Sequence, residues 1–129
     1  TEIKDLYQTA DWKAEKHVPV IELPGSVRPD EEMLINVTVG KEISHPNTTV
    51  HNIGWIEVFF HPEGEKFPYL LGKFEFQAHG AGAQGPDTST VYSGPKAIVA
   101  LKTGKPGTVI ATSYCNVHGL WTSTAELKF

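Results

Sequence analysis

Alternation of apolar and polar residues, with a period of two, is the feature of this sequence that most restricts its fold. The pattern is regular over residues 35–39, 74–76 and 121–127. Such alternation is typical of strands that bury one face. Three further strands, buried on both faces or nearly so, are predicted where β-branched and aromatic residues are dense, at 55–60, 97–101 and 109–114.

Turns rich in glycine and proline separate these segments, as at Pro24-Gly25 and Gly94-Pro95. About seven short strands joined by such turns predict an all-β fold, an antiparallel β-sandwich of immunoglobulin-like type. A chain of 129 residues has the length of one domain. We divide it into an N-terminal arm over 1–13 and a sandwich domain over 14–129. Apolar residues of the arm recur at helical spacing, which favours a turn or two of helix.

Composition argues against several classes of partner. Lys and Arg total 11 and Asp and Glu total 15, so the formal net charge is −4, which argues against nucleic-acid binding. No segment approaches the ~18 consecutive apolar residues of a membrane helix. No apolar run lies near the start, so we expect a cytoplasmic protein. The single cysteine excludes an internal disulfide and a four-cysteine metal site.

Three long irregular segments interrupt the strand pattern, at 15–32, 40–53 and 79–95. Connections of this length in a small domain often carry function. Residues 80–85 match the G-x-G-x-x-G pattern, but they run into Pro86 and Asp87 without helical periodicity. A dinucleotide site needs a helix N-terminus at that point, so we interpret the segment as a glycine-rich loop.

Histidine and cysteine gather in three segments that are irregular or form turns. Cys115 and His118 form a C-x-x-H turn after a predicted strand, His45 and His51 share a proline-stiffened loop, and His17 lies in a third segment. If these segments meet at one end of the sandwich, they offer four imidazoles and one thiolate. Such ligands suit iron, copper or zinc.

Among these metals, a redox-active iron with one open position is favoured. Structural zinc is usually four-coordinate and closed. A blue-copper site needs a distant axial methionine, and the only methionine, Met33, lies far upstream of the C-x-x-H turn. His61 and His79 lack partners at ligand spacing, and we interpret both as structural.

Three motifs, in order and spacing, resemble the superoxide reductases of the one-iron neelaredoxin class, in the desulfoferrodoxin superfamily: EKHVPV at 15–20, HPNTT at 45–49 and SYCNVHGLW at 113–121. The resemblance runs from about Trp12 to the C-terminus. It implies an immunoglobulin-like sandwich that holds one mononuclear non-haem iron (Fe2+/Fe3+) per chain. The implied iron ligands are four equatorial histidines and an axial cysteine: His17, His45, His51, His118 and Cys115.

The same resemblance implies roles for the two residues before His17. Glu15 corresponds to the glutamate that can occupy the sixth position of the oxidised iron, and Lys16 to the lysine beside the open site. The implied reaction is one-electron reduction of superoxide to hydrogen peroxide, with a rubredoxin-like electron donor, in an anaerobe or microaerophile. Relatives of this size are often homotetramers, which implies a homo-oligomer.

Two other functions use the same residues. One is an electron carrier with the same mononuclear metal and no superoxide chemistry, and the other is a structural or binding module stabilised by a metal. A carrier needs neither an open metal position nor a charged residue beside it. The placement of Glu15 and Lys16 next to His17 therefore favours the enzyme.

Overall fold

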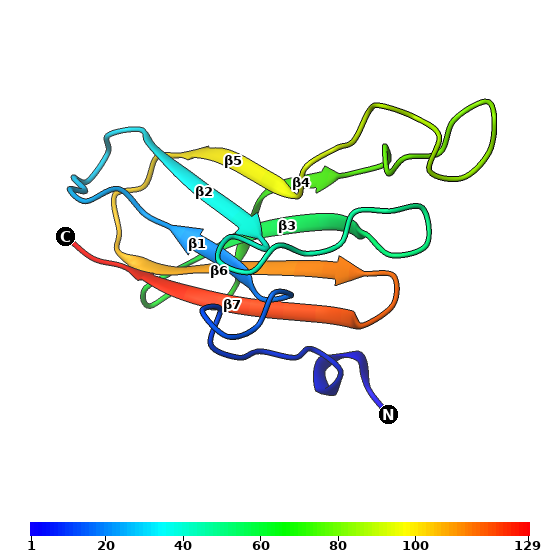
Figure 1. The fold of residues 1–129 in the computed structure, drawn as a ribbon. Helices are drawn as coiled ribbons and strands as arrows, with labels where there is room; N and C mark the ends of the chain where they lie inside the picture. The colour runs from blue at the N-terminus through cyan, green and yellow to red at the C-terminus, as the bar shows by residue number, and fades with distance from the viewer.

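The structure is a computed structural model that describes residues 1–129, and it consists of two antiparallel sheets packed face to face (Figure 1). One sheet has the order β1-β2-β5 and the other β4-β3-β6-β7. The predicted all-β sandwich is confirmed. Its elements are the 3-10 turn η1 (Ile3–Asp5) and the strands β1 (Pro19–Glu22), β2 (Met33–Val39), β3 (Ile53–Pro62), β4 (Tyr69–Glu75), β5 (Lys96–Leu101), β6 (Gly107–Cys115) and β7 (Gly119–Leu127).

The core lies between the two sheets and follows from the period of two. In β2, Ile35 and Val37 point inward and are fully buried, while Leu34 between the inward positions is exposed. Ile56 and Val58 of β3 meet them from the other sheet. Each buried aliphatic side chain of this size contributes about 1.5–3 kcal/mol to stability. The free energy gained by burying these side chains therefore determines which face of each strand packs against the other sheet.

The prediction that residues 97–101 are buried on both faces is wrong. Ala97, Val99 and Leu101 of β5 are buried, but Ile98 between them is half exposed. β5 lies at the edge of the three-stranded sheet, and no further layer covers the outer face of that sheet. A dense apolar run does not by itself distinguish this arrangement from burial on both faces. The outward residues of β3 and β6 are mostly half-buried.

One local feature differs from expectation. Residues 15–32 contain β1, which pairs with β2 so that Val20 lies opposite Thr38. Four residues are too few to display a clear alternation. In the arm, the helix is only the single turn η1, because no side chain caps it and none of its residues is buried.

Strand direction brings four connections to one end of the sandwich, which we call the site end; it lies at the right in Figure 1. β2 ends there at Val39, opposite the first residue of β1, and β6 ends there at Cys115, opposite Ile53 of β3. The β6–β7 turn and residues 76–95 between β4 and β5 lie at the same end. No helix in the structure is long and apolar enough to cross a membrane.

Candidate metal centre

The site end collects all five side chains that the sequence suggests as metal ligands. One donor atom from each of four of them, His17, His45, His51 and Cys115, lies within 4.8 Å of the other three. The fifth, His118, places Nδ1 3.1 Å from Nε2 of His17 and 3.9 Å from Sγ of Cys115. Residues up to 101 positions apart in the sequence therefore meet at one point.

Cys115 is the last residue of β6, and its buried sulfur points into the cluster. Sγ accepts a hydrogen bond from the backbone N–H of His118 at 3.3 Å and lies 3.4 Å from Nε2 of His45. Gly119 closes the turn with φ +84, a backbone conformation that glycine adopts without strain. The turn therefore holds the Cys115 sulfur in a fixed position facing the other donor atoms.

Hydrogen bonds on the far side of two imidazoles determine which nitrogen faces the cluster. Nδ1 of His17 donates to the Glu15 carboxylate at 2.6 Å, and Nδ1 of His45 donates to the Pro46 carbonyl at 2.7 Å. Both residues therefore turn Nε2 toward the centre, whereas His118 presents Nδ1. Histidines that bind metals usually have such a second partner, which fixes the tautomer and the ring orientation.

His51 provides the test of whether these residues suit a metal ion. Its Nε2 is the only buried side-chain nitrogen or oxygen in the structure without a hydrogen-bond partner. Leaving such an atom unpaired costs about 1–3 kcal/mol, so a partner is expected at that point. Imidazole nitrogens bound about 2.1 Å from one ion at right angles would be roughly 3.0 Å apart, close to the separation of His17 and His118. Four imidazoles and a thiolate fit a mononuclear transition metal.

Protonation of His45 and His51 does not compete with metal binding at neutral pH. Burial lowers the pKa of His45 to about 4, and burial also lowers the pKa of His51. The hydrogen bond from the His17 side chain holds the pKa of Glu15 below its usual value. At pH 7 the imidazoles of His45 and His51 are therefore neutral, which is the form that can bind a metal, and Glu15 is a carboxylate.

His45 and His51 lie on the ligand loop, which we define as residues 40–52, between β2 and β3. The loop begins at Gly40, where φ is +81 and an added Cβ would lie 2.6 Å from the backbone nitrogen of His45. Within the loop, Thr48 N donates to His51 O at 3.0 Å, and Asn52 Nδ2 donates to Thr48 O at 3.0 Å. Glycine at position 40 and these internal bonds give an irregular segment a defined shape.

Two residues that the sequence did not single out hold the C-x-x-H turn. The carbonyl oxygen of His118 accepts hydrogen bonds from Gln8 Nε2 at 2.9 Å and from Trp121 Nε1 at 3.3 Å. Trp121 also stacks on the His17 ring, with centroids 5.0 Å apart and planes inclined by 13°. No sequence signal identifies Gln8, because its partners lie more than a hundred residues away. Trp121 is recognisable as an inward residue of a predicted strand and as the last residue of the SYCNVHGLW motif, but neither signal indicates its contacts with His17 and His118.

A pocket of ≈ 350 Å³ opens onto the cluster from the side of the segment before β1. Lys16 lies in its wall, half-buried, between Glu15 and His17. Small anions entering the pocket would meet this ammonium group next to the metal ligands. The lining residues are Ala14, Glu15, Lys16, His17, Ile43 and His118.

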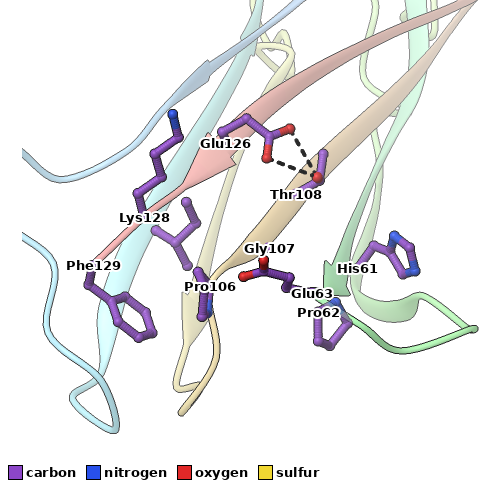
Figure 2. A pocket seen from close by; sticks show the side chains of 10 residues that line it. His61, Pro62, Glu63, Pro106, Gly107, Thr108, Glu126, Lys128 and Phe129 are labelled. Carbon is purple, nitrogen blue, oxygen red and sulfur yellow. Dashed lines mark hydrogen bonds between the residues drawn. The ribbon is translucent and has the colours of Figure 1, made fainter.

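A larger cavity, of ≈ 510 Å³, lies at the opposite end of the sandwich (Figure 2). Thr108 Oγ1 donates to Glu126 there, and His61 points away from that carboxylate, with Nε2 2.7 Å from the Glu65 carbonyl oxygen. No group of metal-binding donors converges in this cavity. The other histidine outside the cluster, His79, is hydrogen-bonded to Asn47.

The fold and the cluster together define a β-sandwich protein with a candidate site for one metal ion. The desulfoferrodoxin family model matches residues 9–124, and the chain belongs to that family. The resemblance inferred from the three sequence motifs is therefore confirmed.

Individual relatives are similar over nearly the whole chain. The neelaredoxin of Megalodesulfovibrio gigas is 52% identical over 120 residues, which are 93% of this chain and 92% of that protein. The superoxide reductase of Pyrococcus furiosus is 52% identical over 126 residues, 98% of this chain and 99% of that one. The solved structure of the superoxide reductase (neelaredoxin) from Archaeoglobus fulgidus in the reduced form superimposes with a TM-score of 0.89 at 56% identity, covering 96% of this chain and 99% of that chain.

Proposed function

We propose that the protein is a superoxide reductase, an oxidoreductase that converts superoxide to hydrogen peroxide at one mononuclear non-haem iron. The observation that carries the proposal is the convergence of four imidazoles and one thiolate beside a pocket walled by Lys16. Relatives named superoxide reductase, about half identical over the full chain, support the same assignment.

The residues that would hold the iron are His17, His45, His51, His118 and Cys115. When bound, the iron supplies one electron by cycling between Fe2+ and Fe3+, and a thiolate ligand favours that donation. Superoxide takes up one electron and two protons to become hydrogen peroxide. The protons come from water that reaches the open pocket.

Lys16 and Glu15 have separate tasks in this proposal. The Lys16 ammonium attracts the anionic substrate into the pocket, against the repulsion of a chain with formal net charge −4. The Glu15 carboxylate orients His17 by accepting two hydrogen bonds, one from Nδ1 of the ring at 2.6 Å and one from the backbone N–H of His17 at 3.0 Å. If the Glu15 carboxylate released these bonds to His17, it would be free to act as a ligand of the oxidised iron, as the family resemblance implies.

We further propose the partners and setting that the family resemblance implies. The electron donor is a small rubredoxin-like protein, the chain forms a homo-oligomer such as a homotetramer, and it acts in the cytoplasm. The arm over 1–13 and the iron-binding domain over 14–129 form the two parts of the chain.

Metal analysis combined with rapid mixing tests the function. The purified protein should hold about one iron per chain. When the reduced protein is mixed with superoxide, one hydrogen peroxide should form for each iron oxidised, without release of oxygen. An electron carrier would exchange electrons with a donor but show no change in visible spectrum on the timescale of superoxide addition. A structural module would keep its properties with zinc in place of iron.

A further inference from the structure

We propose that residues 79–95, which we call the buttress loop, position the His45–His51 part of the ligand loop, and that Asp87 is the principal positioning residue. This loop contains the G-x-G-x-x-G pattern that serves no nucleotide site, and the proposed chemistry leaves it without a role. The inference rests on the proposed function only in taking His45 and His51 as metal ligands.

The tip of the buttress loop binds the ligand loop between its two histidines. The backbone N–H of Thr49 donates to Asp87 Oδ1 at 3.1 Å, and Thr49 Oγ1 donates to Asp87 Oδ2 at 3.2 Å. Thr48, the preceding residue, is bonded to His51 in both directions: Thr48 N donates to His51 O, and His51 N donates to Thr48 Oγ1 at 3.1 Å. A displacement of Thr49 is therefore transmitted to His51 through one hydrogen-bonded turn.

The base of the buttress loop binds the ligand loop at a second point. Asn47 Nδ2 donates to the Ser93 carbonyl at 3.0 Å, and Nδ1 of His79 lies 2.8 Å from Asn47 Oδ1. Ser93 is fixed in turn by two bonds to Ala78, one from its own N–H at 2.7 Å and one to its hydroxyl oxygen at 3.1 Å. Residues 47 and 49 are thus both held from outside the ligand loop, and His45 and His51 flank them.

The backbone of Asp87 is in an unusual conformation that fits this role. Its φ of +57 places it in the left-handed region, which residues with a Cβ seldom adopt, and only one other non-glycine residue, Asp30 with φ +62, does so in this chain. Such strain persists where surrounding contacts require it. Gly80 and Gly85 also have positive φ, so two glycines of the G-x-G-x-x-G pattern shape the loop that presents Asp87.

Removal of the Asp87 carboxylate should loosen the metal ligands without unfolding the protein. Loss of a hydrogen-bonding partner outside the ligands themselves typically weakens metal binding 10–100-fold. Asp87 acts one residue further away, through Thr49 and Thr48. We therefore expect an effect near the lower limit, about tenfold.

The test compares Asp87→Gly with Asp30→Gly in the iron-loaded protein. Both substitutions remove an aspartate carboxylate and relieve the same backbone strain, but Asp30 lies at the opposite end of the sandwich, before β2. The measurements are the rate of iron transfer to a chelator and hydrogen–deuterium exchange across residues 45–52. Asp87→Gly should lose iron about tenfold faster and expose the Thr49 amide to exchange. Asp30→Gly should match the wild type, and Asp87→Asn, which keeps one acceptor oxygen, should be intermediate.

Two results would overturn the proposal. One is wild-type iron release and wild-type exchange over residues 45–52 in Asp87→Gly. The other is an equal effect of Asp30→Gly, which would mean that strain or global stability, and not position, governs iron retention. A protein that holds iron but does not react with superoxide would defeat the proposed function and leave this test unaffected.

Discussion

Both ends of the sandwich have a cavity, but metal-binding side chains converge at only one of them. The end with the five metal-binding side chains has a pocket of ≈ 350 Å³, and the opposite end has one of ≈ 510 Å³ (Figure 2). The larger cavity contains polar groups, but Glu126 is bonded to Thr108 and His61 to Glu65. At the site end, by contrast, half-buried His51 has a buried nitrogen, Nε2, without a hydrogen-bond partner. The convergence of donor atoms, one of which lacks a hydrogen-bond partner, identifies the place for chemistry, and the volume of a cavity does not.

Among paired substitutions at the two ends, Cys115→Ser and its control should differ most in iron binding. It removes the only soft anionic ligand, and we expect iron binding to weaken by more than the roughly 100-fold that marks loss of an outer partner. The visible spectrum of the iron-loaded protein should change at the same time. His61→Ala, at the opposite end, is the control and should keep both iron content and spectrum. A cysteine variant with a normal spectrum would remove Cys115 from the site.

His51→Leu, at the site end, should raise the stability of the metal-free protein and lower its affinity for iron. Leucine replaces a buried nitrogen that lacks a partner, so the metal-free variant should be more stable to denaturant by about 1 kcal/mol. The same change removes one of the proposed ligands, so iron affinity should fall steeply. Denaturant unfolding and iron titration measure the two effects. A metal-free variant that is less stable than the wild type would show that Nε2 of His51 has a partner within the protein.

Much of this architecture was predictable from the sequence because it depends on local patterns. The alternation at residues 35–39 determines which side chains of β2 are buried, and the C-x-x-H spacing places Cys115 and His118 on one turn. Strand order then brings the three ligand segments to one end.

The contacts that hold the ligands in place were not predictable in this way. Gln8 reaches His118 across 110 positions, and Asp87 reaches Thr49 across 38. Neither residue belongs to a periodic pattern, and glutamine and aspartate are ordinary surface residues elsewhere. Such roles depend on which loops the fold places side by side, and a single sequence contains no local signal for that.

Lys16→Ala tests whether the positive charge at the site end acts on the substrate. Local attraction of an anion raises association rates by 10-fold or more, so the variant should react with superoxide about tenfold more slowly. Its rate should also decline less with added salt. Lys105→Ala is the matched control, because it lies at the opposite end, paired with Glu65, and also changes the formal net charge from −4 to −5. If the two variants had equal rates and equal salt dependence, Lys16 would affect the reaction only through the net charge of the protein and not through its position beside the site.

Gln8→Ala should have the smallest effect, because it removes only one of the two hydrogen bonds to the His118 carbonyl and leaves the Trp121 bond in place. The backbone of Gln8 still bonds to β7, through Leu120 O and Thr122 N, so the arm should stay attached. We expect a loss of stability of about 1 kcal/mol and a small shift in the reduction potential of the iron-loaded protein, since His118 gains freedom to move. Gln77→Ala is the control, because its amide bonds only to the exposed Glu75. If Gln8→Ala lost the expected stability but kept the reduction potential of the wild type, the arm would support the fold without positioning His118.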